Sequence, residues 1–314
     1  MRVALITSCT SRKRVAPLRD LRAHKLSPGP LTNVAADWVD RLRSARSRVP
    51  ARDFYAGRSF TEALAAAAAC EGTLHIVSAG MGLIHVDDPV PPYSLTVAGR
   101  VSDNVLSRVK DGVARPAHWW AALNGRLRQG DPLSRLIKSK SADRFVLALP
   151  STYVDLVAND LGSLSASAAA GVRVIGLPSL AAKLPSVLSQ SFIPYDERLE
   201  NTRTGYAGTR ADFVQRATRH FITCVLAQDL SGSCEEHAAA VGRFLGGFSR
   251  RRIQRRERIS DERVKEVIRD MWIESRGRVG HSLRLLRRQR RLSCEQSRFK
   301  RLFWEVAAEI GVGA

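Results

Sequence analysis

The chain has few cysteines, few acidic residues and no long hydrophobic run. Five cysteines occur among 314 residues, and since none has CxxC spacing, neither a disulfide framework nor a zinc site is expected. The seven histidines lack metal-ligand spacing as well. No apolar stretch reaches the roughly 18 residues of a membrane-spanning helix, and the first basic cluster follows the first apolar stretch, the reverse of a secretory signal. We therefore expect a cytoplasmic protein without a metal, a cofactor or a membrane anchor.

The shortage of acidic residues leaves a strong positive charge. Fifty Lys and Arg against thirty Asp and Glu give a net charge of +20, and such a field attracts polyanions. Residues 250–301 alone hold 17 Arg and 2 Lys against 7 acidic residues, a net charge of +12. Nucleic acid is the first candidate partner and an anionic membrane surface the second. Double-stranded DNA is the partner we expect, with no obligate protein partner.

Short apolar runs alternate with helical stretches ahead of this basic segment. Such runs are typical of strands buried on both faces. Strands that alternate with helices predict a three-layer α/β/α domain with a mainly parallel sheet, whose ligands bind beyond the carboxyl ends of the strands. The expected strands are Val3–Thr7, Leu74–Ser78, Phe145–Leu149 and Val172–Leu177, and the expected helices are Phe60–Cys70, Ala117–Arg128, Thr152–Leu161 and Ala211–Leu230.

The charge distribution predicts two domains joined by a linker. We expect a catalytic α/β domain over residues 1–230, a linker over residues 231–250 and a basic helical module over residues 251–314. The module's helices are expected at Asp261–Ser275, capped by Ser260, at His281–Arg291, and at Cys294–Ile310, capped by Ser293. Three short helices with a basic middle one resemble a helix-turn-helix bundle. The middle helix carries an i, i+3, i+4, i+7 arginine face that predicts DNA phosphate binding, with a plain solvated surface as the alternative; its members are Arg284, Arg287, Arg288 and Arg291.

Polar residues follow the expected strands. After the first strand come Cys9, Ser11 and Lys13, a pattern that suits a phosphate or nucleotide held by backbone N–H groups, although a solvated basic loop explains it too. After the second come Ser78, Gly80 and Gly82, where glycines allow a ligand to approach the backbone; a tight turn is the alternative.

Two acidic and aromatic segments complete the candidate site. Asp53 and Tyr55 precede a helix and suit a carboxylate beside a stacking ring, or else a helix start with a core aromatic. Tyr93 lies in a proline-stiffened loop, and Asp196 follows Tyr195 in a later loop. Tyrosines that recur near strand ends and in loops favour a nucleobase pocket, because bases stack on aromatic rings.

The order of these motifs resembles a known family. C-x-S-x-K after the first strand, D-x-Y-x-G-x-x-F, S-A-G-x-G-L-I, P-x-Y, P-Y-D-x-R-L and G-T-R-x-D-F resemble an uncharacterised bacterial family related to the uracil-DNA-glycosylase-like fold. The chain is also similar to anti-phage DNA glycosylases that excise glucosylated hydroxymethylcytosine. It lacks the uracil-glycosylase signatures GxDPY and HPSP, so no residue role transfers from that enzyme.

The resemblance implies an N-glycosidic hydrolase that leaves abasic sites in phage DNA, as antiviral defence. In such an enzyme Tyr55 and Tyr93 would stack on the everted base. Asp53 would stabilise the sugar cation and orient water, with Asp87, Asp88 and Asp196 as alternatives. The groups that would donate to the departing base are Lys13, Ser11, Ser78 and the Gly80–Gly82 backbone.

Three other interpretations remain open at this stage. Lys13 could form a Schiff base and cut the strand. The protein could exchange bases, as a transglycosylase or a tRNA-modifying enzyme, or it could be a non-catalytic DNA-binding regulator.

Overall fold

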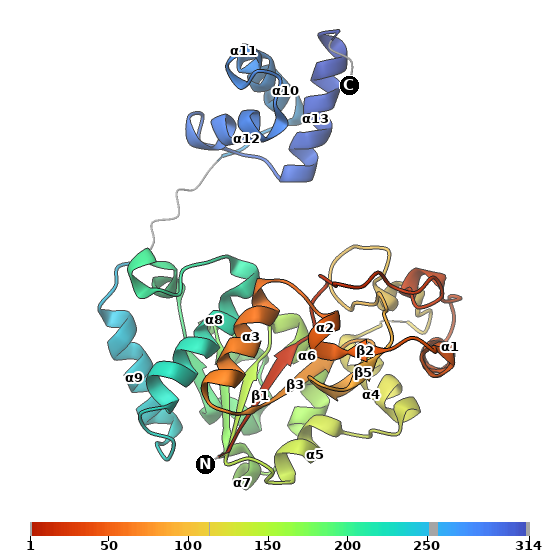
Figure 1. The fold of residues 1–314 in the computed structure, drawn as a ribbon, viewed down its shortest axis with the longest axis vertical. Helices are drawn as coiled ribbons and strands as arrows, with labels where there is room; N and C mark the ends of the chain where they lie inside the picture. The colour runs from red at the N-terminus through yellow and green to blue at the C-terminus, as the bar shows by residue number, and fades with distance from the viewer. Residues whose placement is uncertain (1, 113, 251–256, 312–314) are drawn as a thin grey trace. The chain divides into compact units, whose positions relative to one another are not determined.

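A computed structural model describes residues 2–112, 114–250 and 257–311. The chain divides into two compact units, Met1–Arg251 and Arg252–Ala314 (Figure 1). Among the described residues, no helix combines the length and the apolar character needed to cross a membrane.

The first unit is built on a six-stranded sheet with the strand order β4-β3-β1-β6-β7-β8. All neighbouring pairs are parallel except β3 and β4, which form an antiparallel hairpin. The strands are β1 (Val3–Ser8), β3 (Thr73–Ser78), β4 (Gly82–His85), β6 (Arg144–Ala148), β7 (Val172–Gly176) and β8 (Phe192–Pro194). β2 (Val49–Pro50) and β5 (Pro89–Val90) pair separately. The four expected strands are confirmed, because their apolar runs are the buried centre of the sheet.

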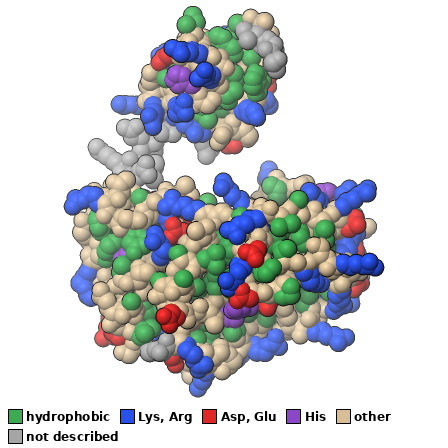
Figure 2. Space-filling view, in the orientation of Figure 1, with side chains coloured by type: hydrophobic (Ala, Val, Ile, Leu, Met, Phe, Trp, Pro, Cys, Tyr) green, Lys and Arg blue, Asp and Glu red, His purple; other side chains and the backbone are tan. Residues whose placement is uncertain are grey.

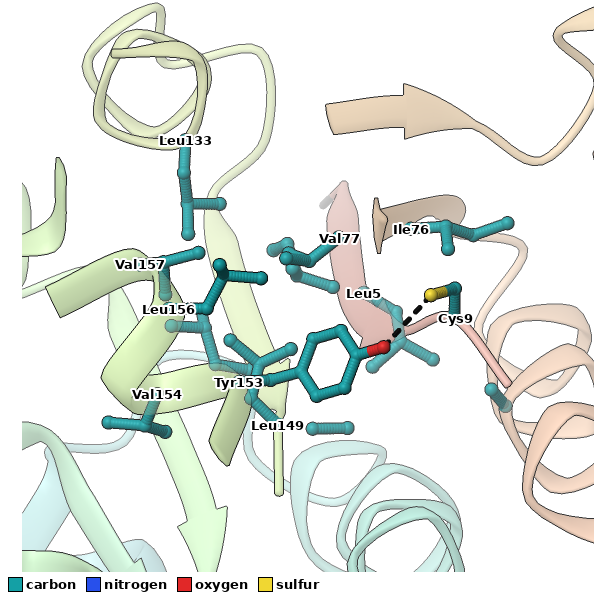
Figure 3. Close-up of a cluster of buried hydrophobic side chains, with 14 of the residues drawn as sticks. Leu5, Cys9, Ile76, Val77, Leu133, Leu149, Tyr153, Val154, Leu156 and Val157 are labelled. Atoms are coloured by element: carbon teal, nitrogen blue, oxygen red, sulfur yellow. Dashed lines mark hydrogen bonds between the residues drawn. The ribbon is translucent and has the colours of Figure 1, made fainter. Parts of the chain in front are cut away.

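Helices cover both faces of this sheet, as expected for a three-layer α/β/α domain (Figure 1). One layer holds α3 (Arg58–Ala69), α8 (Phe213–His220) with its π-helical continuation Phe221–Leu226, and α9 (Cys234–Gly246). The other holds α1 (Leu31–Ser44), α4 (Pro116–Leu127), α5 (Pro132–Lys138) and α6 (Ser151–Gly162). Two four-residue helices complete the unit, α2 (Ala51–Phe54) and α7 (Ala166–Ala169). Figure 3 shows α6 side chains packed on those of β1 and β3.

The linker expected over residues 231–250 is wrong. That segment contains α9, which begins at a capping box formed by Ser233 and Glu236 and buries Val241 and Leu245 in the core of the first unit. Arg173 of β7 holds the preceding loop by donating to the Gly232 carbonyl oxygen at 2.8 Å, and it holds the first turn of α9 by donating to Nδ1 of His237 at 3.0 Å. The glycine-rich and serine-rich composition around this helix is that of its flanking turns, which the composition alone could not separate from a linker.

The second unit is a small helical bundle with its own core. Its helices are α10 (Asp261–Asp270), α11 (Trp272–Ser275), α12 (Val279–Arg288) and α13 (Gln296–Glu309), and β9 (Glu257–Arg258) pairs with β10 (Leu292–Ser293). Ile268, Leu286 and Phe303 are among its buried residues. Ser260 caps α10 as expected. The cap of α13 is Glu295 and not Ser293, because the Glu295 carboxylate accepts the backbone N–H groups of Ser297 and Arg298.

Candidate active site

The carboxyl ends of β1, β3 and β6 meet at the centre of the sheet. From β1 the chain first adds β3 and β4 on one side and later adds β6, β7 and β8 on the other. The strand order therefore reverses at β1, and such switch points are where open α/β sheets bind ligands. Cys9, Ser78 and Tyr153 all lie just at or beyond these three strand ends.

The loop after β1 runs beside the segment after α2. The backbone of Arg14 donates to Phe54 at 2.9 Å, and that of Ala56 donates to Arg12 at 3.0 Å. Lys13 and Tyr55 therefore form an antiparallel bridge. Gly57 follows this paired segment and has φ of +95°, a backbone conformation that other residues rarely adopt. The pairing brings the segments around Lys13 and Tyr55 side by side.

Lys13 lies in a cup of three aromatic rings. Its Nζ atom is 4.2 Å from the ring centroid of Tyr55, 4.8 Å from that of Phe54 and 5.0 Å from that of Tyr93. It donates to the Thr10 carbonyl oxygen at 2.5 Å, and within the described residues no carboxylate pairs with it. Loss of hydration disfavours the charged amine and lowers the pKa of Lys13 to about 8. At neutral pH Lys13 is therefore an ammonium that releases its proton more readily than an ordinary lysine.

Tyr55 and Tyr93 lie beneath this ammonium and not in an open pocket. Both side chains are 0% exposed. Their hydroxyl groups are 2.7 Å apart, and the Tyr93 hydroxyl is also 2.6 Å from Oγ of Ser78. Burial raises the pKa of both phenols, so they remain neutral. The expected stacking of an everted base on these two rings is wrong for this conformation, because neither face is accessible; the rings hold Lys13 instead.

The Ser78–Gly82 turn is occupied by the protein itself. Oγ of Ser78 accepts the backbone N–H groups of Gly80 at 3.2 Å and Met81 at 3.0 Å. The indole groups of Trp38 and Trp119 donate to the carbonyl oxygens of Gly80 and Ala79, at 2.8 and 2.7 Å. The predicted donation from Ser78 and the Gly80–Gly82 backbone to a departing base is therefore wrong, and the alternative of a tight turn is what the structure contains.

Both glycines are required by close packing within the protein. A Cβ atom at Gly80 would lie 2.6 Å from Cε2 of Tyr93. A Cβ atom at Gly82 would overlap Oε1 of Gln129 and Oδ1 of Asn124. The close approach that the sequence predicts is thus real, but protein side chains and not a ligand make it.

Replacing Gly80 by alanine is expected to destabilise the first unit by about 1–3 kcal/mol, the usual cost of overpacking a core. The added methyl group must displace the Tyr93 ring, which then loses its hydrogen bond to Ser78. Gly242 is the matched control, because it lies within α9 with open space around its Cβ position. There alanine is expected to stabilise the helix by about 0.5–1 kcal/mol. Urea denaturation measures both, and equal effects at the two sites would contradict the packing explanation.

Cys9 and Tyr153 close the seam between β1 and β6. Cys9 is buried, and its Sγ atom is 2.9 Å from the Tyr153 hydroxyl group (Figure 3). Tyr153 belongs to α6, and its ring packs among leucine and valine side chains of the core, where burial raises the pKa of its phenol. The Cys9 side chain therefore lies at this seam, where it is hydrogen-bonded to the Tyr153 hydroxyl group.

Gln215 is a buried polar residue of the same seam that the sequence analysis missed. Its Nε2 atom donates to Oγ1 of Thr7 at 3.3 Å and to the Ala148 carbonyl oxygen at 3.2 Å, thereby joining β1 to β6. Its Oε1 atom is buried without a hydrogen-bond partner among the described residues. The signal that could have found it is a glutamine on the inward face of an otherwise amphipathic helix.

The predicted acidic residues do not join this cluster. Asp53 and Ser11 are exposed, and their side chains form no hydrogen bond or ion pair within the described segments. Asp196 pairs with Arg198 at 2.8 Å; burial alone would raise the pKa of Asp196, but hydrogen bonds and the charge of Arg198 outweigh it and hold the pKa below its ordinary value. Asp87 pairs with Arg52.

The motif G-T-R-x-D-F contributes Thr209 and Asp212 to a hydrogen-bond network around Arg216, and Glu200, directly after P-Y-D-x-R-L, completes it. This guanidinium is fully buried and donates at 2.6 Å to Asp212, to Glu200 and to the Thr209 carbonyl oxygen. Burial alone would raise the pKa of Asp212, but the hydrogen bonds from Arg216 and Thr209 hold it below its ordinary value. This network stabilises the α/β unit, and Asp196, predicted to bind substrate, forms an ion pair with Arg198.

In the helical module several acidic residues of α10 and α13 form ion pairs. Asp261 pairs with Arg298 at 2.5 Å and with Arg301 at 2.7 Å. Lys265 pairs with Glu305 at 2.7 Å, and Arg269 pairs with Glu309 at 2.5 Å. These cross-helix pairs hold α10 against α13 and leave little net charge on that side.

The arginines of α12 are not neutralised in this way. Arg284, Arg288 and Arg291 are exposed, and none forms an ion pair within the described residues. Arg291 lies beyond the end of α12, with φ of +55°. Arg287 departs from the predicted face: it is half-buried and donates to the Cys294 carbonyl oxygen at 3.0 Å. Figure 2 shows Lys and Arg side chains gathered on the visible face of the module. Three arginines that flank α12 are also exposed and form no ion pair within the described residues, and the helical spacing did not predict them: Arg276, Arg278 and Arg290.

The described residues contain no group of three or more His, Cys, Asp or Glu side chains arranged to hold a metal ion. Comparison of the chain with protein-family models, with curated proteins and with solved structures finds no significant match.

Proposed function

We propose that this protein is a DNA glycosylase of the uracil-DNA-glycosylase-like fold. Its substrate would be a modified cytosine in phage DNA, carrying a glucosylated hydroxymethyl group, and its product an abasic site. The observation that most directly supports an enzyme is Lys13, a desolvated amine without a carboxylate partner, beside the reversal point of the strand order. Excision of such bases would serve antiviral defence.

Lys13 would act as the proton donor to the leaving base. Cleavage of the N-glycosidic bond leaves negative charge on the base, and a positioned acid that neutralises it contributes about 100- to 10,000-fold to the rate. A pKa of about 8 keeps Lys13 protonated at neutral pH and still able to transfer its proton. Tyr55 and Tyr93 would be positioning residues that hold the amine.

Asp53 remains our candidate for the carboxylate that orients water and stabilises the sugar cation. Its position two residues before Tyr55, with an exposed carboxylate that has no partner among the described residues, leaves it available to substrate. Arg12 and Arg14, exposed on either side of Lys13, would contact the phosphates next to the everted nucleotide.

The helical module would bind the phosphates of the DNA backbone through the arginines of α12. Replacing Arg284 and Arg288 together by glutamine is expected to weaken DNA binding uniformly across sequences. It should also reduce the slope of log affinity against log salt by about 0.9 per lost phosphate contact. Arg301 is the matched control, because Asp261 and Glu305 already neutralise it. Fluorescence anisotropy over a salt series measures both slopes, and a larger loss in the Arg301→Gln protein would contradict the assignment of α12.

The proposed function is tested with the full chain and two DNA samples. DNA that contains glucosylated hydroxymethylcytosine and the same sequence with ordinary cytosine are incubated separately, and mass spectrometry identifies the small molecules released. We expect the free glucosylated base from the first sample only, with one abasic site for each base. Intact modified DNA after prolonged incubation would refute the proposal.

Burial of Tyr55 and Tyr93 favours one alternative, a DNA-binding regulator without catalysis, because no stacking surface is open. That alternative predicts salt-sensitive binding and no covalent change in either DNA. The same incubation therefore distinguishes the two functions.

A further inference from the structure

The loop around Lys13 offers hydrogen-bond donors that the protein does not use. The backbone N–H groups of Thr10, Ser11, Arg12 and Lys13 donate to no acceptor among the described residues. The carbonyl oxygen of Thr10 accepts one N–H of the Lys13 ammonium, and the others have no acceptor. Exposed Arg12 and Arg14 add two positive charges. A phosphodiester is the chemical group that matches a row of free N–H donors beside arginines.

The surroundings of the Lys13 amine differ from those of a lysine that only attracts phosphate. An ordinary phosphate-binding lysine extends into water as a hydrated charge. Lys13 instead has its Nζ atom against three ring faces, and its side chain is only partly exposed. Aromatic faces attract the cation but cannot hydrate it. The free energy needed to convert the ammonium to the neutral amine is therefore lower here than in water. Desolvated lysines of this kind form Schiff bases with carbonyl groups.

We infer that Lys13 is also a covalent nucleophile, which attacks the abasic sugar and makes the protein an abasic-site lyase. The source of the abasic site rests on the proposed function, whereas the lyase step needs only abasic DNA. After Lys13 gives its proton to the leaving base, the neutral amine remains beside C1′ of the sugar.

The step balances with water and a proton from solvent. The Nζ lone pair forms a bond to C1′ of the ring-opened aldehyde, and the resulting carbinolamine takes up one proton from solvent and loses water to give a protonated imine. Loss of a C2′ proton to solvent then expels the 3′ phosphate with the electron pair of the C3′–O bond. Hydrolysis of the imine releases an unsaturated aldehyde and restores Lys13. No oxidant or reductant is consumed.

Borohydride trapping tests this inference on abasic DNA prepared in advance. A labelled duplex with one abasic site, made by removing uracil with a separate enzyme, is incubated with the full chain and sodium borohydride, which reduces the imine to a stable amine. We expect a covalent adduct, and peptide mapping is expected to locate it on Lys13. The Lys13→Arg protein keeps the positive charge but cannot form the imine, and it should give no adduct.

Lys25 and Lys110, which are exposed and unpaired within the described residues, are the control positions; Lys25→Arg and Lys110→Arg proteins should give the wild-type adduct. No adduct with wild type, or an undiminished adduct with Lys13→Arg, would overturn the inference. An adduct without release of base from modified DNA would support the lyase and refute the glycosylase. Release of base without an adduct would support the glycosylase and refute the lyase.

Discussion

Replacing Lys13 by glutamine is expected to slow release of the modified base by about 100- to 10,000-fold, the range that a positioned proton donor contributes. Glutamine is similar in length and can still donate a hydrogen bond, but it carries no transferable proton. The aromatic cup should tolerate the change, because removing a charge from a site without a counter-ion leaves no carboxylate unpaired. The expected loss is therefore in the rate of the chemical step and not in folding.

Single-turnover measurements across pH separate proton donation from a structural role. The wild-type rate should fall as pH rises through about 8, because only the ammonium form can protonate the base. The Lys13→Gln protein should lack this descending limb. Lys25→Gln is the control, and its rate and pH profile should match wild type. A wild-type rate that does not change between pH 7 and pH 9.5, on either side of the value near 8, would rule out Lys13 as the acid.

Replacing Arg216 by methionine is expected to destabilise the first unit by about 3–5 kcal/mol, the usual cost of removing one partner from a buried ion pair. The substitution leaves the Asp212 and Glu200 carboxylates, which lie mostly inside the protein, without the guanidinium that each contacts at 2.6 Å. A loss of this size is a large share of the roughly 5–15 kcal/mol by which domains are stable.

Urea denaturation of wild type, Arg216→Met and Arg243→Met measures this effect. Arg243 is exposed on α9 and unpaired among the described residues, so its replacement should change stability by less than about 0.5 kcal/mol. Adding Asp212→Asn and Glu200→Gln to Arg216→Met should recover part of the loss, because the uncompensated charges are then gone. A destabilisation by Arg216→Met no larger than that of Arg243→Met would contradict the network as a source of stability.

The buried tyrosines change the chemistry that this fold can support. Tyr55 and Tyr93 are fully buried, and their hydroxyl groups are hydrogen-bonded to each other and to Ser78 inside the protein. Stacking on them would require those hydrogen bonds to break and the rings to become exposed. Holding Lys13 requires no such change, and this is why we place the chemistry on the amine.

The sequence by itself determined the four central strands of the first unit and several of its helices, but neither the edge strands β4 and β8 nor the helices α1, α5 and α9. Continuous apolar runs such as Val3–Ser8 can be buried on both faces only as central strands, and helix-forming runs such as Arg58–Ala69 need no distant partner to define them. The sequence also predicted the basic module, because the net charge of a segment follows directly from its composition.

Only the tertiary structure decided which of the polar residues near the strand ends are buried and which are exposed. Lys13, Tyr55 and Tyr93 lie together, but the two tyrosines are fully buried, whereas Asp53 is exposed to solvent. Gln215, more than 200 positions from Thr7 in the chain, contacts it directly. Local sequence patterns record which backbone conformation a segment prefers, whereas exposure depends on neighbours supplied by distant segments. That is why the sequence placed the strand ends correctly and could not distinguish a binding residue from a packing residue there.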